Sequence, residues 1–184
     1  MSSTPFTTEV KPNWEALVSC ICREGTPKRV HYIELFLDEE IKAAICEKYS
    51  LLSGLQQDDK YFTLKREIAI QRFLGYDSVR CCFDPGTMDM ALNTVVASDT
   101  AKLQRNDGRE YIDEHSGPIT NWQEFEAYPW PDPRKASTIN LEWYQENLPD
   151  DMCIIGTEGF AHFAENINWL MGYETLCYAL YEQR

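Results

Sequence analysis

Residues 78–86 read SVRCCFDPG. The β-branched, aromatic and cysteine side chains over Ser78–Phe83 are typical of a buried strand, and the triplet Asp84-Pro85-Gly86 ends that strand at once. Directly before it, apolar residues at helical spacing predict a helix over Thr63–Leu74, which Gly75 ends as its C′ residue. A buried strand next to a helix is typical of a sheet built from α/β units.

The same combination occurs on the N-terminal side. The segment Val30–Leu37 (VHYIELFL) predicts a second buried strand. It is followed by a predicted helix over Glu39–Lys48, with Asp38 as the N-cap.

A third strand is predicted on the C-terminal side, over Met152–Gly156 (MCIIG). Two helices follow it, over Phe160–Met171 and Tyr173–Glu182, divided at Gly172. Because strands alternate with helices along the chain, we expect a parallel sheet.

The remaining segments predict additions to this pattern. Residues 1–12 are polar and contain proline, which is typical of a flexible arm. Further helices are expected over Trp14–Cys22 (N-cap Asn13), Thr120–Tyr128 and Asn140–Asn147, and a hairpin is expected from Lys102–Arg105 and Arg109–Asp113 around Asn106-Asp107-Gly108.

The charge is strongly acidic and uneven. The chain has 17 basic and 30 acidic residues, a net charge of −13, and residues 110–184 hold only 3 of the basic residues but 14 of the acidic ones. Such a chain repels phosphate backbones and anionic membrane surfaces, so we expect neither nucleic acid nor membrane as a partner. A small-molecule substrate is the expected ligand, and a homodimer is among the expected assemblies.

The seven cysteines and the N-terminal sequence point to a reducing compartment. The number of cysteines is odd and no pair has C-x-x-C spacing, so we interpret them as packed thiols. The N-terminus has no signal-peptide pattern, and no apolar run is long enough to cross a membrane. The prediction is a cytoplasmic protein.

Four stretches resemble the uroporphyrinogen decarboxylase family, in particular its divergent branch that is related to corrinoid methyltransferases. They are RVHYIELFLDEEI, FLGYDSV, YIDEHSGPITNWQEFEAYPWPDP and GFAHFAENINWLMGYETLCYALYEQ. The resemblance extends from Trp14 to Arg184, and it implies the N-terminal portion of a (β/α)8 TIM barrel, over residues 13–184, with an extra N-terminal helix and a hairpin insertion. Since a closed barrel needs about 250 residues, either the fold is a smaller open α/β sheet or, as we expect, the chain is part of a longer protein.

The resemblance implies cofactor-independent decarboxylation of a porphyrinogen-type or other small carboxylic acid. Its methyltransferase branch implies zinc and a corrinoid partner, and a non-catalytic subunit or inert fragment is the third alternative. True decarboxylases carry an Arg-Gln-Ala-Gly-Arg-Tyr run after the first strand, whereas ELFLDEE stands at that place here. This loss of arginines favours methyl transfer and argues against uroporphyrinogen, which carries many carboxylates.

Asp84 and Glu34 are the candidate catalytic residues. Asp84 follows a strand at the face where barrel enzymes have their sites, and it matches in position the family's catalytic aspartate; the alternative is a turn residue. Glu34 lies in an apolar strand, where its carboxylate would shape the pocket or form an ion pair with Arg29 or Arg80.

Substrate contacts are expected from residues near these two carboxylates. Alternation along a strand places Tyr32 and Phe36 on the same face as Glu34, and His31 on the opposite face as a packed residue. The candidate substrate-binding residues are Tyr32, Phe36, Arg80, Glu158 and His162. We interpret three tryptophans as anchors of the core: Trp130, Trp143 and Trp169. With Glu165, the pair Glu158 and His162 would suit a metal or acid–base site.

Overall fold

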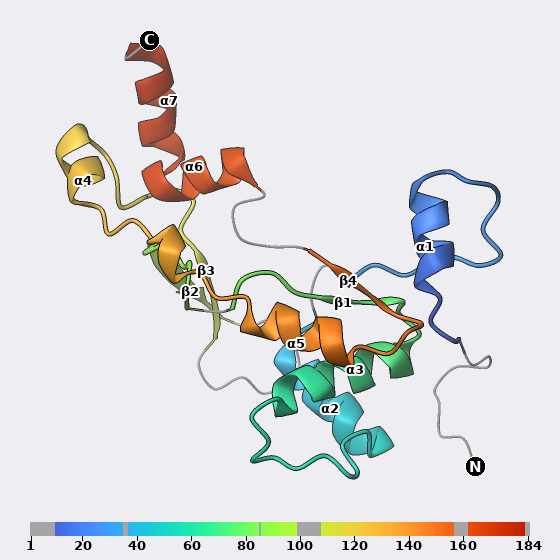
Figure 1. Cartoon of the computed structure of the whole chain (residues 1–184). Helices are drawn as coiled ribbons and strands as arrows, with labels where there is room; N and C mark the ends of the chain where they lie inside the picture. The colour runs from blue at the N-terminus through green and yellow to red at the C-terminus, as the bar shows by residue number, and fades with distance from the viewer. Residues whose placement is uncertain (1–9, 35–36, 85, 99–107, 157–161, 183–184) are drawn as a thin grey trace. The chain divides into compact units, whose positions relative to one another are not determined.

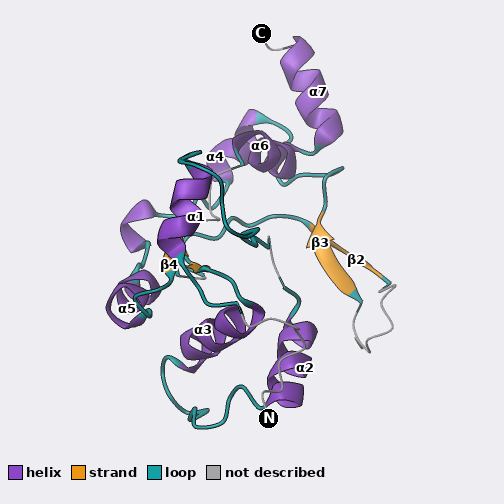
Figure 2. Cartoon of the chain, turned by 90° about the vertical axis from the view of Figure 1, so that its right-hand side faces the viewer, coloured by secondary structure: helices purple, strands orange, loops and turns teal. Residues whose placement is uncertain are grey.

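The computed structural model describes residues 10–34, 37–84, 86–98, 108–156 and 162–182, and these form a mixed α/β structure (Figures 1 and 2). Residues 1–82 and 138–157 make one compact unit, and residues 83–137 and 158–184 make a second. The elements, in chain order, are α1 (Trp14–Ile21), α2 (Glu39–Tyr49), α3 (Phe62–Leu74), β1 (Ser78–Arg80), β2 (Thr94–Ala97), β3 (Arg109–Ile112), α4 (Trp122–Ala127), the 3₁₀ helix η1 (Pro133–Lys135), α5 (Ile139–Asn147), β4 (Cys153–Ile155), α6 (Phe163–Met171) and α7 (Tyr173–Glu182).

The first unit is built on the two predicted strands β1 and β4. They pair in parallel, with Val79 opposite Ile154, as the alternation of strands and helices predicts. Helices α3 and α5 pack around this sheet, and the fully buried side chains of Val79 and Tyr144 form its core together with Met152. The Tyr144 hydroxyl lies 3.5 Å from the Leu64 carbonyl oxygen, to which it donates.

Helix α1 is capped as the sequence predicts. The Asn13 side chain accepts a hydrogen bond of 2.8 Å from the Ala16 backbone N–H. The helix is held against the start of β4, because the Trp14 N–H donates to the Asp151 carbonyl at 3.2 Å. Asp151 in turn pairs with Arg72 near the end of α3.

The predicted strand over Val30–Leu37 is wrong for the residues that the structure describes. Residues 30–34 form no strand, and Val30, Tyr32 and Ile33 are each at least half exposed. β-branched residues favour a strand chiefly when they pack on a half-buried face, and that burial is missing here. The polar side chains of this segment bind side chains beside β1 instead, as described below.

The second unit contains the expected hairpin, with a different first strand. Strands β2 and β3 are antiparallel, with Thr94 opposite Ile112. Lys102–Arg105 and most of the expected turn lie outside the described residues. Gly108, at the start of β3, has a φ of 76°, and a Cβ there would lie 2.6 Å from the Ala97 carbonyl oxygen. Glycine is therefore required at this position.

Helix α4 begins close to the predicted capping signal, with Asn121 rather than Thr120 as its N-cap residue. In α4 the Asn121 side chain accepts from the Glu124 N–H at 3.0 Å, and Glu124 accepts from the Thr120 N–H at 2.7 Å, which is a capping box. Helices α6 and α7 are divided at Gly172, where φ is 73°. Helix α6 begins at Phe163, three residues later than predicted.

Among the described residues the strands form two sheets of two strands each, with no closed barrel. None of the helices in the described ranges is both long and apolar enough to span a bilayer. All seven cysteines are free thiols.

Candidate functional site

Asp84 follows β1 in a tightly hydrogen-bonded turn. Its backbone N–H donates to the Ser137 carbonyl at 2.8 Å, and the Ser137 hydroxyl donates to its carboxylate. The Thr87 hydroxyl donates to the Asp84 carbonyl at 2.7 Å. The carboxylate is therefore half-buried, and these contacts fix its orientation within the second unit. This geometry contains the turn that the sequence predicts, and it also holds the carboxylate in a defined direction.

Glu34 makes a different contact from either of those expected. The Tyr76 phenol donates a hydrogen bond to its carboxylate. Burial of the phenol, followed by the negative charge and the hydrogen bond of Glu34, raises the pKa of Tyr76 above its ordinary value. The Tyr32 ring lies edge-on to the Tyr76 ring, with 6.2 Å between the centroids. Arg80 contributes a long hydrogen bond of 3.4 Å to the Glu34 carbonyl oxygen.

Two of the predicted site residues, Tyr32 and Glu34, therefore contact Tyr76, and a third, Arg80, contacts Glu34. The expected ion pair between Glu34 and Arg29 does not form, because Arg29 binds Asp77. Tyr76 comes before β1 in the chain whereas Asp84 comes after it, so the Glu34 carboxylate is directed toward the amino end of the strand. Phe36, the fourth residue expected on this face, lies outside the described residues.

A buried ionic cluster around Asp77 was not predicted from the sequence. Asp77 is fully buried, and its carboxylate accepts hydrogen bonds from the Asn13 N–H at 2.6 Å and from the Arg29 guanidinium. His31 Nδ1 lies 2.7 Å from the other carboxylate oxygen, and its side chain is only 4% exposed. His31 is thus a packed residue, as predicted, and it contacts a different neighbour from Tyr32.

The Asp77 cluster holds the first unit together. It joins the start of α1, residues 29–31 and the amino end of β1, and the Asp77 carbonyl also accepts from the Cys153 N–H at 3.0 Å. The Asp77 carboxylate is fully buried and is engaged by Asn13, Arg29 and His31 of the same unit. The position of Asp77 therefore indicates a structural role.

The contacts of residues 29–34 alternate as those of an extended chain do. Arg29 and His31 both bind Asp77, while Tyr32 and Glu34 both contact Tyr76. The period of two was read correctly from the sequence, although no backbone ladder forms.

His162 is an exposed residue at the N-cap of α6. Its Nδ1 lies 2.9 Å from a Glu165 carboxylate oxygen, and both side chains are more than 40% exposed. Glu158, its predicted partner, lies outside the described residues. The i, i+3 pair that is seen is an ordinary surface contact.

Within the described ranges, no three His, Cys, Asp or Glu side chains are placed to share a metal ion. The zinc that the methyltransferase branch implies therefore finds no set of ligands in this part of the chain. Burial raises the pKa of the Cys46 and Cys153 thiols, so both favour the protonated form that packs as a small apolar group.

Comparison with known proteins returns no match: no family model, no curated protein and no solved structure is similar to this chain at a significant level.

Proposed function

We propose that the chain forms the N-terminal portion of a uroporphyrinogen-decarboxylase-like (β/α)8 barrel and takes part in the cofactor-independent decarboxylation of a small carboxylic acid. The observation that carries this proposal is the Asp84 carboxylate, which follows β1 in the chain and accepts a hydrogen bond from the Ser137 hydroxyl, while the Thr87 hydroxyl donates to the Asp84 backbone carbonyl. The parallel pairing of β1 with β4 supports the barrel, because adjacent parallel strands direct their carboxyl ends to one edge.

The proposed role of Asp84 is electrostatic. When an electron-rich ring loses an attached carboxylate group as CO₂, the ring first takes up a proton and becomes cationic. A fixed carboxylate at hydrogen-bond distance stabilises that cation and accepts hydrogen bonds from its N–H groups. The bond between the ring's CH₂ substituent and CO₂ then breaks, and its electron pair forms an exocyclic double bond that neutralises the ring. A proton from water adds to that methylene, and the proton that the ring took up returns to water, which leaves the methyl-substituted ring. Ser137 acts as a positioning residue, because it fixes the direction of the Asp84 carboxylate.

The substrate that this arrangement favours carries few carboxylates. Arg29 is bound to Asp77, and Arg80 contacts the Glu34 carbonyl oxygen. Lys42, which follows the ELFLDEE stretch at the place where true decarboxylases carry their arginine-rich run, pairs with Glu67. With these side chains engaged in internal contacts, a substrate with many carboxylates would meet little positive charge, whereas a monocarboxylic ring compound fits better.

Methyl transfer from a corrinoid to a small acceptor is the second candidate. The engagement of Arg29 and Arg80 favours it, because methyl transfer does not require cations that hold substrate carboxylates. Since the described residues provide no zinc site, we assign no step of this reaction to them.

Protein purified from its own cells tests both candidates. We expect it to release ¹³CO₂ from one member of a panel of carboxyl-labelled pyrrole and indole acetic acids, and the Asp84→Asn variant to lose about 100-fold in kcat. Ser137→Ala should lower kcat less and leave KM nearly unchanged. Asp58→Asn, the same change at an exposed position, is the matched control and should be fully active.

Methyl transfer from methylcobalamin to a thiol, without CO₂ release, would establish the second candidate instead. If neither product forms, or if Asp84→Asn is as active as Asp58→Asn, the proposed role of Asp84 is wrong and the non-catalytic alternative takes its place.

A further inference from the structure

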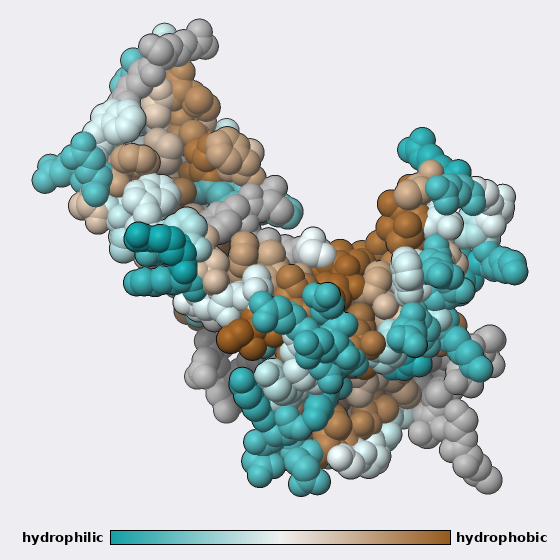
Figure 3. All heavy atoms as spheres, viewed as in Figure 1, coloured by the Kyte–Doolittle hydropathy of each residue, from teal (hydrophilic) through white to brown (hydrophobic). Residues whose placement is uncertain are grey.

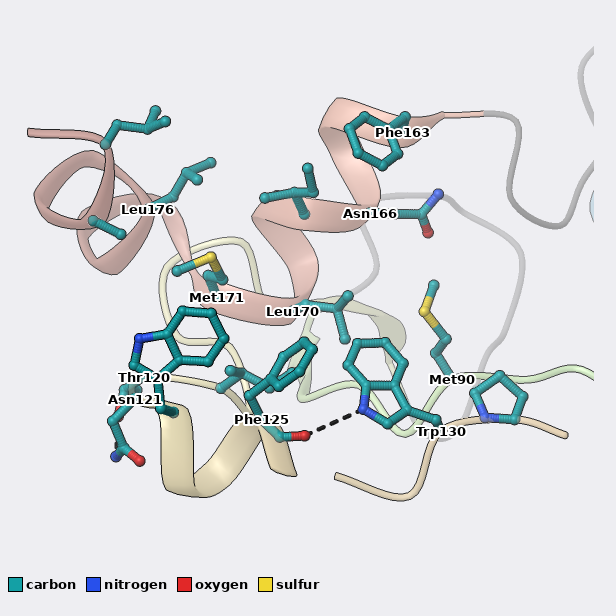
Figure 4. A pocket seen from close by; sticks show the side chains of 16 residues that line it. Met90, Thr120, Asn121, Phe125, Trp130, Phe163, Asn166, Leu170, Met171 and Leu176 are labelled. Atoms are coloured by element: carbon teal, nitrogen blue, oxygen red, sulfur yellow. Dashed lines mark hydrogen bonds between the residues drawn. The ribbon is translucent and has the colours of Figure 1, made fainter. Parts of the chain in front are cut away.

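An apolar pocket of about 630 Å³ lies within the second unit (Figure 4). Its volume falls in the range of roughly 300–1,000 Å³ that is typical of small-molecule sites. Figure 4 shows Phe125 and Trp130 on one side of the pocket, with Leu170 and Met171 of α6 facing them. The space-filling view shows apolar surface over α6 and α7 (Figure 3). Asp84 does not line this pocket, so the inference is independent of the reaction proposed above.

The aromatic wall is built in advance of any ligand. The rings of Trp122 and Phe125 meet edge to face with centroids 5.5 Å apart, and those of Phe125 and Trp130 do the same at 5.2 Å. Trp122 is 69% exposed and Trp130 is 44% exposed. The prediction that Trp130 anchors the core is therefore wrong. Large aromatic rings at this exposure are typical of surfaces that bind ligands.

The opposite wall is fixed to the aromatic wall by close backbone contacts. The Ile119 N–H donates to the Leu170 carbonyl at 2.9 Å, and the Tyr173 N–H donates to the Glu114 carbonyl at 2.9 Å. A Cβ on Gly117 would lie 2.3 Å from the Leu170 carbonyl oxygen, so only glycine allows this approach. Because residues 114–119 lead directly into α4, the two walls are held at a defined separation.

The polar groups that line the pocket are engaged in helix caps. Thr120 and Asn121 belong to the capping box of α4, and the Asn166 amide donates to the His162 carbonyl at 2.9 Å. The Trp130 indole N–H donates to the Phe125 carbonyl at 3.2 Å, as the dashed line in Figure 4 shows. The remaining lining side chains are apolar, so a ligand gains free energy here mainly by burying apolar surface.

The charge around the pocket selects against anions. Helices α4, α6 and α7 supply most of its lining, and they carry Glu124, Glu126, Glu165, Glu174 and Glu182 with no Lys or Arg. An anionic ligand would be repelled at close range by these carboxylates.

We infer that this pocket binds an uncharged, flat aromatic small molecule, which stacks against Trp122, Phe125 and Trp130 and contacts the apolar face of α6. The volume, the preformed aromatic wall, the engaged polar groups and the acidic helices each favour that class of ligand. The alternative occupants are a second copy of the chain or another protein segment, and the experiment below distinguishes them from the small molecule.

The test uses Nile red as a neutral fluorescent probe and a pair of competitors of one shape. We expect Nile red to bind saturably with one site per chain, and 2-naphthamide to displace it. The isosteric anion 2-naphthoate should compete more weakly by roughly tenfold or more, the effect of about 1.4 kcal/mol of like-charge repulsion. Equal displacement by both competitors would overturn the assignment of an uncharged ligand.

Variants of α7 locate the binding site. Ala179 lines the pocket, so Ala179→Trp should fill it and abolish Nile red binding. Cys177 lies on the same helix, is exposed and does not line the pocket, so Cys177→Trp is the matched control and should bind normally. Met90→Trp fills the pocket from a loop and serves as the second test if Ala179→Trp does not fold.

Three results contradict the inference. Nile red that does not saturate at one site, or that binds the two pocket-filling variants as well as it binds Cys177→Trp, shows that this pocket is not the site. Sedimentation velocity gives the third: a dimer that Ala179→Trp dissociates and that excludes Nile red would identify a second copy of the chain as the occupant.

Discussion

Removal of the Asp77 charge gives the sharpest test of what holds the first unit together. Asp77→Asn keeps the size of the side chain and one acceptor oxygen, but it replaces the second carboxylate oxygen with a donor. That donor then faces either the Arg29 guanidinium or His31 Nδ1, both of which contact the carboxylate in the folded chain. The charge-assisted hydrogen bonds of the carboxylate are weakened or lost, and Arg29 becomes a cation without a paired anion.

The expected loss of stability follows from burial. One hydrogen bond to a charged group contributes about 1.5–3 kcal/mol, and breaking a buried ion pair by removing one partner costs about 3–5 kcal/mol. Asp77 is fully buried, but the Arg29 side chain is 25% exposed and regains some hydration, which places the estimate near the lower end. We expect Asp77→Asn to lower the free energy of unfolding by about 3 kcal/mol.

Urea denaturation followed by tryptophan fluorescence and circular dichroism measures this change. With a slope of about 2 kcal/mol/M, the midpoint should fall by about 1.5 M. Hydrogen exchange should increase first in α1, because the Asn13 N–H donates to Asp77. Asp58→Asn, at an exposed position, is the matched control and should change the midpoint little.

A double-mutant cycle tests whether the unpaired Arg29 cation contributes to the loss of stability in Asp77→Asn. In the Asp77→Asn background, Arg29→Gln should restore part of the lost stability, with a coupling energy of about 1 kcal/mol or more. A midpoint for Asp77→Asn that equals that of Asp58→Asn would refute the reasoning, because it would mean that the cluster contributes no net stability.

Three further outcomes are expected. Gly172→Ala should destabilise the second unit by well over 1 kcal/mol, because the new Cβ would lie 2.5 Å from the His115 carbonyl oxygen. Gly54 also has a positive φ but has open space around it, so Gly54→Ala should lower the stability measured by thermal unfolding less. Glu34→Gln should lower the pKa of Tyr76 part of the way toward its ordinary value, because the neighbouring negative charge is removed while burial remains. Absorbance at 295 nm between pH 9 and pH 13 measures the titration of the phenol, and an unchanged titration would contradict the contact between Glu34 and Tyr76. Asp151→Asn should destabilise the chain by about 0.5 kcal/mol at neutral pH, because its arginine partner on α3 lowers the pKa of Asp151. This contribution is fully present above the unfolded-state pKa and is lost as the pH falls through the lower folded-state value, so a series of denaturation curves from pH 7 downward should show the difference shrinking in acid.

Local signals in the sequence predicted most helices and both strands of the parallel pair. The cap residues Asn13 and Glu124 act within four residues of their partners, so they can be read from spacing alone. The Val30–Leu37 segment was misread because strand formation depends on a partner and a buried face, and neither is encoded in the segment itself. Tertiary context overrode its β-branched composition.

The candidate site was predicted in part, for a similar reason. The alternation that places Tyr32 and Glu34 together is a local property, and the structure places both against Tyr76. Asp77 was missed because its partners are Asn13, Arg29 and His31, between 46 and 64 residues away. An acidic residue immediately before a buried strand, with a basic residue and a histidine in another apolar segment, is the signal that would have pointed to it.

The distribution of basic residues connects these findings to the choice of ligand. The sequence alone places positive charge mainly in residues 1–109, which would allow the first unit to hold an anionic substrate. The structure engages that charge internally: Arg29 with Asp77, Arg66 with Glu39, and Arg72 with Asp151. A guanidinium already paired with a carboxylate must lose that partner before it can bind another, so these residues favour stability over recognition of anions. The internal pairing of these arginines and the acidic helices around the apolar pocket both favour ligands of low negative charge at the two proposed sites. A tight complex with any polycarboxylate would require that these ion pairs open.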